Sequence, residues 1–164
     1  MRSNLFYNGR MQFANRHIER VKPEEMTIIG WQKEVSYASL WNIIIAMREG
    51  EELPPVRLRS VLKSDALFID AKKNDPRSTN KRKDGGHARV AAAYIERAPL
   101  TAELGGRALL WLPDDAIGVS QIELVEKMGN EDSKRAENPQ FYTHVPNRSE
   151  IEYMQDRLAT TVNF

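Results

Sequence analysis

Residues 84–93 read Asp-Gly-Gly-His-Ala-Arg-Val-Ala-Ala-Ala, and the rest of the chain can be interpreted around them. Two adjacent glycines, a histidine and an arginine that run into an alanine-rich segment are typical of a turn that leads directly into a helix. The backbone N–H groups at such a helix start favour an anion. The stretch therefore predicts a phosphate-binding turn, although Asp-Gly-Gly is also an ordinary turn before a helix.

The composition is that of one globular domain. The 164 residues are 41% hydrophobic and 29% charged, and they include no cysteine. Disulfides, thiolate zinc sites and cysteine nucleophiles are therefore excluded. Residues 1–20 lack the apolar core of a signal peptide, and no apolar run approaches the length of a membrane span. We therefore expect a soluble, cytoplasmic protein that makes no contact with membranes.

Charge is unevenly distributed along the chain, although the net charge is only +1. Residues 72–89 carry +5 and residues 1–22 carry +4, which leaves −8 for the remainder. This uneven charge predicts a molecular dipole with one face that suits phosphates. The alternative for each basic segment is a solvated loop without a ligand. The loop at 72–83 contains no aromatic residue, so it would contact a nucleic-acid backbone rather than stack on bases. Its candidate nucleic-acid contacts are Lys72, Lys73, Arg77, Lys81, Arg82 and Lys83.

Local patterns in the first half of the chain predict a helix and two strands. Apolar residues at helical spacing predict a helix from Ser36, as N-cap, to Glu49, with Gly50 just beyond its end. Alternating residues at 56–61 and an apolar run at 66–70 predict two strands joined by a short turn. Residues 1–35 show no clean period, except for an extended piece at Val21 followed by a turn or short helix that begins with Pro23.

Further helices are expected in the second half. The alanine-rich helix should run from about Gly86 to Arg97, followed by a turn or single helical turn at 100–106 and a buried strand at 108–112. Ser120 with Glu123, and Ser149 with Glu152, have the spacing of capping boxes and predict two more helices. The order of elements predicts an α+β fold, with a small mixed sheet and flanking helices.

The segment at 39–112 resembles the ParB/sulfiredoxin-like (ParB-like nuclease) domain family. The matching pieces are Leu-Pro-Pro-Val-Arg-Leu at 53–58, Leu-Phe-Ile-Asp at 67–70 and the glycine turn with its helix at 85–93. The resemblance covers about half of the chain. It implies a ParB/sulfiredoxin-like core at 36–113 within a single domain 1–164, with an N-terminal extension at 1–35 and a C-terminal helical extension at 114–164.

In that family the turn and the helix start hold phosphates of nucleotides or nucleic acids, and members include DNA-partitioning CTPases, nucleases, small kinases and sulfiredoxins. Ala88 interrupts the His-Arg pair of the family, and a long basic insertion precedes the turn. Sulfiredoxin chemistry needs a cysteine and is excluded. Carried over by position, the phosphate contacts are Gly85, Gly86, His87 and Arg89.

Asp84 and His87 are the candidate catalytic residues. His87 can donate to a phosphate oxygen or act as an acid or base, with a solvated side chain as the alternative. Asp84 can serve as a base or hold Mg²⁺ beside a bound nucleotide, with a turn or cap as the alternative. Asp70 and the pair at 114–115 are further carboxylate candidates. No histidine has a partner at ligand spacing, so no transition-metal site is expected, and no P-loop motif is present.

Three functions follow as hypotheses. The first is a protein that binds phosphates of a nucleotide or nucleic acid. Such a protein could also hydrolyse a phosphoanhydride or phosphodiester with Mg²⁺, as an NTPase or nuclease does. The second is a non-enzymatic DNA-binding or regulatory module that uses the basic loop. The third is a phage or mobile-element protein that binds and inhibits a host protein. The sequence does not indicate an oligomeric state.

Overall fold

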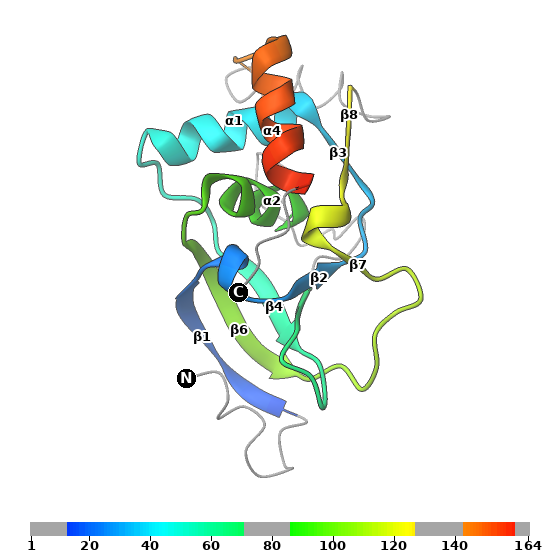
Figure 1. Cartoon of the computed structure of the whole chain (residues 1–164). Coiled ribbons are helices and arrows are strands. Elements are labelled where there is room, and N and C mark those ends of the chain that lie inside the picture. Colours follow the sequence, from blue (N-terminus) through cyan, green and yellow to red (C-terminus); the bar gives the residue numbers. More distant parts are fainter. Residues whose placement is uncertain (1–12, 71–85, 127–142, 160–164) are drawn as a thin grey trace.

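A six-stranded mixed sheet forms the base of the molecule, and three helices lie on one side of it (Figure 1). This architecture comes from a computed structural model that describes residues 13–70, 86–126 and 143–159. Within these residues the chain is an α+β protein, as the sequence predicts. The strands, in spatial order, are β1 (Phe13–Val21), β6 (Leu100–Arg107), β4 (Val56–Ser60), β5 (Leu67–Ile69), β2 (Ile28–Gly30) and β7 (Ile117–Gly118).

The sheet combines both kinds of strand pairing. β1 is antiparallel to β6, β4 to β5 and β2 to β7, while β6 is parallel to β4 and β5 to β2. A separate two-stranded parallel sheet joins β3 (Glu34–Ser36) to β8 (Glu123–Val125). Parallel neighbours need crossover connections, and the crossover between β4 and β6 includes helix α2.

Helix α1 (Tyr37–Arg48) confirms the helix predicted after Ser36. The Ser36 hydroxyl accepts the backbone N–H of Ser39, and Gly50 has a φ of +74° just beyond the helix. The N–H groups of Gly50 and Glu51 donate to the carbonyls of Met47 and Ala46, which is a Schellman ending.

Helix α2 (Gly86–Glu96) also begins where it is predicted, and it is buried over nearly its whole length. It contacts β4 and β6 on one side and α1 and α4 (Arg148–Ala159) on the other, and Figure 1 shows it between the sheet and these two helices. Four of its residues are alanines at 5% exposure or less. Small side chains let neighbouring elements approach closely, so the alanine-rich sequence suits this central position.

Strands β4 and β5 confirm the predicted pair, but the next predicted elements are wrong. Residues 100–107 form strand β6 rather than a turn, because Leu100, Ala102 and Leu104 point into the core while the intervening residues point away. Residues 108–112 are not a buried strand: Trp111 is 74% exposed and Leu110 is 48% exposed. Ala108 is buried and Leu109 packs against Val61 and Phe68, so only the last three residues of the run are exposed.

The helix predicted at Ser120 is wrong over the described residues. A short 3-10 helix, η3 (Val119–Gln121), is followed by β8. Ile122 and Leu124 are buried with a spacing of two, and that alternation fits the pairing of β8 with β3 better than a helix. Residues 127 and beyond of the predicted helix lie outside the described residues.

Helix α4 confirms the last predicted helix, with a different cap. The reciprocal hydrogen bonds join Asn147 and Glu150, at 2.9 Å each, rather than Ser149 and Glu152. Met154 and Leu158 are buried against the core, as their spacing predicts.

The segment at 13–35 contributes directly to the main sheet. β1 pairs along β6 and carries a bulge between Ala14 and His17. Gly105, with a φ of +121°, faces this bulge, and a Cβ there would lie 2.5 Å from the Asn15 carbonyl oxygen. Pro23 opens the short 3-10 helix η2 (Pro23–Glu25), which confirms the prediction for this turn. No helix within the described ranges has the length and apolarity needed to cross a membrane.

Candidate phosphate site at the start of α2

The first turn of α2 brings together three of the residues singled out from the sequence. Gly86, His87 and Arg89 all lie there and are buried. Asp84 and Gly85 lie outside the described residues, as do all six basic residues of the predicted nucleic-acid loop, Lys72, Lys73, Arg77, Lys81, Arg82 and Lys83. The part of the predicted site that can be described is therefore the helix start itself.

The carboxylate candidates that can be placed are not part of this turn. Asp70 directly follows β5, and its N–H donates to the carbonyl of Arg57. Asp114 and Asp115 are exposed in the connection between β6 and β7. Nothing in the described contacts brings these three carboxyl groups to His87.

His87 is enclosed by the segment that follows β2. Its side chain is 1% exposed, and its Nε2 accepts the backbone N–H of Trp31 at 3.1 Å. The Trp31 and His87 rings meet edge to face, with centroids 4.7 Å apart. Gly30 makes room for this ring, since a Cβ at that position would lie 2.5 Å from both Cδ2 and Nε2 of His87. Sequence analysis missed Gly30 and Trp31, whose only local signal is a glycine at the end of a short apolar run.

Burial fixes the charge state of His87. Removal from water lowers its pKa from 6.5 to about 4, so the imidazole is neutral at pH 7. Because Nε2 accepts a hydrogen bond, the single proton of the neutral ring must be on Nδ1. Nδ1 is buried and makes no hydrogen bond within residues 13–70, 86–126 and 143–159. A buried N–H donor without an acceptor is costly, so this atom marks a place where an acceptor would be stabilised.

Arg89 is directed to the chain that precedes β4. Its Nη1 donates to the carbonyl oxygens of Pro54 and Pro55, the second at 3.2 Å, and the residue is 8% exposed. These contacts tie the first turn of α2 to the proline segment. In this arrangement Arg89 positions the helix start and the entry to β4, and the described contacts do not aim its Nη1 at an external phosphate.

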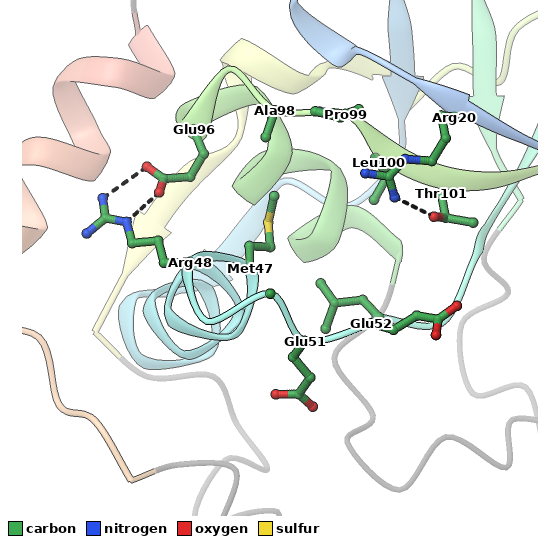
Figure 2. Close-up of a pocket in the computed structure, with 12 residues that line it drawn as sticks. Arg20, Met47, Arg48, Glu51, Glu52, Glu96, Ala98, Pro99, Leu100 and Thr101 are labelled. Atoms are coloured by element: carbon green, nitrogen blue, oxygen red, sulfur yellow. Dashed lines mark hydrogen bonds and ion pairs between the residues drawn. The ribbon is translucent and has the colours of Figure 1, made fainter.

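A surface pocket lies between the end of α1 and the start of β6. It is an open pocket of about 490 Å³, and its lining includes Arg20, Arg48, Glu52, Glu96 and Thr101 (Figure 2). Arg48 is paired with Glu96 on one side, and Arg20 donates to the Thr101 hydroxyl at 2.7 Å on the other. Arg48 is engaged by both oxygens of the Glu96 carboxylate, and Arg20 makes a single contact with a hydroxyl.

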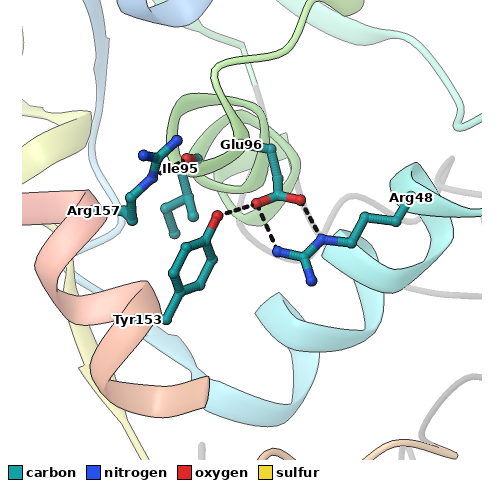
Figure 3. Close-up of polar contacts among 5 residues, drawn as sticks. All are labelled: Arg48, Ile95, Glu96, Tyr153 and Arg157. Atoms are coloured by element: carbon teal, nitrogen blue, oxygen red, sulfur yellow. Dashed lines mark hydrogen bonds and ion pairs between the residues drawn. The ribbon is translucent and has the colours of Figure 1, made fainter. Parts of the chain in front are cut away.

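The Arg48 and Glu96 pair belongs to a network that fastens α4 to the body of the protein (Figure 3). Arg48 donates to both oxygens of Glu96, at 2.5 and 3.0 Å, and the Tyr153 hydroxyl donates to the same carboxylate at 2.5 Å. Burial raises the pKa of Glu96, but the hydrogen bonds from Arg48 and Tyr153 outweigh it and the net pKa is lowered. Arg157 adds a bond to the carbonyl of Ile95. These contacts hold α4 against α1 and α2.

Within the described ranges no three histidine or acidic side chains gather in a way that would hold a metal ion. No family model matches the chain, and no curated protein or solved structure is significantly similar to it. The site must therefore be interpreted from its own chemistry.

Proposed function

We propose that this protein binds a phosphate group of a nucleotide or nucleic acid at the start of α2, in a fold of the ParB/sulfiredoxin-like kind. The observation that carries the proposal is the buried, neutral His87, whose Nδ1–H has no acceptor among the described residues. The N–H groups of the first turn of any helix also lack partners within that helix, and the helix dipole favours negative charge at that end. A phosphate oxygen would satisfy these donors together.

Binding is better supported than catalysis by His87. A group with a pKa near 4 is a weak acceptor of protons at pH 7. Mg²⁺-dependent hydrolysis remains part of the proposal only through Asp84, the candidate Mg²⁺ ligand, which lies outside the described residues. The cysteine-free composition suits a reducing, cytoplasmic location.

The direct test is a titration of the protein with CTP, ATP and a DNA duplex at low salt, followed by calorimetry and by the ¹⁵N resonance of His87 Nδ1. We expect at least one of these ligands to bind and to shift that resonance. His87→Phe keeps a ring of similar shape but removes the donor, and should weaken binding at least tenfold. His17→Gln, which replaces a histidine on β1, is the matched control. Binding to none of the ligands, or binding that leaves the Nδ1 resonance unchanged, would show that the proposal is wrong.

A protein-binding role is the second candidate, because Leu110, Trp111 and Leu112 are consecutive and exposed. Exposed apolar residues in a row are typical of contact surfaces for other proteins. This hypothesis predicts a complex with a protein partner that survives His87→Phe and is lost on Trp111→Ser. The same pair of variants therefore separates the two functions.

A further inference from the structure

The side of the sheet that faces away from the helices carries a concentration of arginines. On β6 and β4 alternate residues point into the core, including Leu100, Ala102 and Leu58, and on β1 Val21 does so. The residues between them point to the other side, because side chains alternate along a strand. We call this side of the three strands the open face.

The register of the strands shows which open-face side chains are neighbours. Arg20 on β1 lies opposite Thr101 on β6, and Ile18 lies opposite Glu103. Arg57 on β4 is the parallel partner of Glu103 and donates to its carboxylate at 3.3 Å. Arg16 approaches the same carboxylate at 3.9 Å from the other strand. Glu103 therefore stands between two arginines.

The balance of charge on the open face is strongly positive. Arg59 follows Arg57 on the same side of β4, and its Nε donates to the carbonyl of Arg107 at 2.7 Å. The only acidic open-face residue on the described parts of the three strands is Glu103, and Asp70 lies just beyond, after β5. Against them stand four arginines, Arg16, Arg20, Arg57 and Arg59.

Arg16, Arg20 and Arg57 are exposed, and Arg59 is half-buried. The side chains of Arg16 and Arg57 are 45% and 49% exposed. Gly106 leaves space for the guanidinium of Arg16, since a Cβ there would lie 3.2 Å from its Nη2. Each guanidinium has five N–H donors, so a single contact with Glu103 or a hydroxyl leaves donors for another acceptor. Arginine donors in this geometry match phosphate oxygens well.

The residue types on these strands indicate which acceptor fits. Residues 15–21, 56–60 and 100–107 contain no aromatic side chain, so stacking on unpaired bases is not available from them. Phe68 on β5 lies opposite Arg59, but at 8% exposure it cannot stack on a base. Arginines without an exposed aromatic neighbour on these stretches suit a row of phosphates. We propose that the open face binds the phosphate backbone of double-stranded nucleic acid without reading its sequence. The α2 site shares no residue with this face, so the two proposals can fail separately.

The test compares three variants that each change one charge. Arg57→Gln removes an open-face cation, Glu103→Gln removes its acidic neighbour, and Arg148→Gln removes a 93% exposed arginine on α4. The affinity for a short DNA duplex of mixed sequence is measured over a range of salt concentrations. Each phosphate contact contributes about 0.9 to the slope of log K against log salt concentration.

We expect Arg57→Gln to reduce this slope by about 1 and to weaken binding at low salt. Glu103→Gln should strengthen binding, because it removes the carboxylate that competes with phosphate for two arginines. Arg148→Gln should match the wild type. Circular dichroism of each variant confirms the fold, which exposed substitutions of this kind leave intact.

Two results would overturn the proposal. One is an unchanged slope in Arg57→Gln, and the other is an equal loss in Arg148→Gln, which would reflect net charge alone. An RNA duplex measured in parallel shows whether the backbone of DNA or of RNA is preferred. If anionic vesicles bind and neither duplex does, the open face is a membrane-facing surface and the proposal is wrong.

Discussion

The first turn of α2 and the open face of the sheet both present cationic or basic side chains, in opposite environments. Arg89 is 8% exposed and donates to two backbone carbonyls, whereas the side chain of Arg57 is 49% exposed and contacts one carboxylate. His87 is buried and neutral, whereas His17 on β1 has a side chain that is 48% exposed and lies 3.2 Å from Glu19. The same residue types are therefore used in two ways.

The difference shows that basic residues in this chain do not form one class of phosphate ligand. A buried guanidinium whose donors meet the backbone costs free energy to disturb and contributes to stability. An exposed one contributes little to stability and is available to a partner. Substitution of the buried basic residues should therefore lower the free energy of unfolding. Substitution of the exposed basic residues should instead weaken binding to a partner.

The largest expected effect is on stability, in Arg89→Met. This change keeps most of the apolar stem but removes the donors to Pro54 and Pro55, and should lower the free energy of unfolding by about 3 kcal/mol. The matched change on the open face, Arg57→Met, should cost about 1 kcal/mol or less. Urea unfolding of both variants provides the measurement. Equal losses would mean that the two environments do not differ in the way proposed.

The second effect is a pH dependence that the buried histidine should produce. The pKa of His87 is about 4 in the folded protein and near 6.5 when the chain unfolds, so the unfolded state binds the proton first as the pH falls. Stability is therefore fully present above pH 6.5 and is lost progressively towards pH 4, by about 3 kcal/mol in total.

The contribution of His87 can be isolated by comparison. Carboxyl groups also titrate in this range, so the free energy of unfolding is followed against pH in the wild type, His87→Phe and His17→Gln. His87→Phe should flatten the curve between pH 6.5 and 4, and His17→Gln is the reference for replacing an exposed histidine. Parallel curves for all three proteins would contradict the buried, neutral state of His87.

The sequence predicts those parts of the fold that depend on neighbours along the chain. The Ser36 cap, the left-handed Gly50 and the start of α2 at Gly86 are determined within a few residues. Strand β6 is different, because its alternation is weakened by two glycines and its partner β1 lies in a segment without a clear period. Long-range pairing makes it a strand, and no local signal indicates that pairing.

The candidate site, like the fold, is predicted from the sequence only where it depends on neighbouring residues. The sequence correctly places Gly86, His87 and Arg89 at a helix start. It cannot show that Arg89 meets carbonyls 34 and 35 residues earlier, or that Trp31 donates to His87 from 56 residues away. These contacts arise only when α2 packs against the sheet. The arginines of the open face were visible as alternating residues on a strand, but their neighbours on β1 and β6 became known only from the strand order.

The smallest effect comes from a change beside His87 rather than in it. In Gly30→Ala the new methyl group would lie 2.5 Å from the imidazole, so the ring must move and its bond to the Trp31 N–H must lengthen. We expect a loss of about 2 kcal/mol in the free energy of unfolding and faster hydrogen exchange at the Trp31 amide. Gly118→Ala is the control, since its nearest contact would be the flexible Gln121 side chain at 3.4 Å.

Gly30→Ala also separates the two regions in binding. The methyl group would meet His87 at 2.5 Å and Ile69 Cδ1 at 3.3 Å, and neither residue is on the open face. Binding of nucleotide at α2 should therefore weaken while the salt dependence of duplex binding keeps the slope of the wild type. A change in that slope would show that the open face depends on the packing of α2. The buried basic residues and the exposed ones would then not have separate roles in stability and in binding.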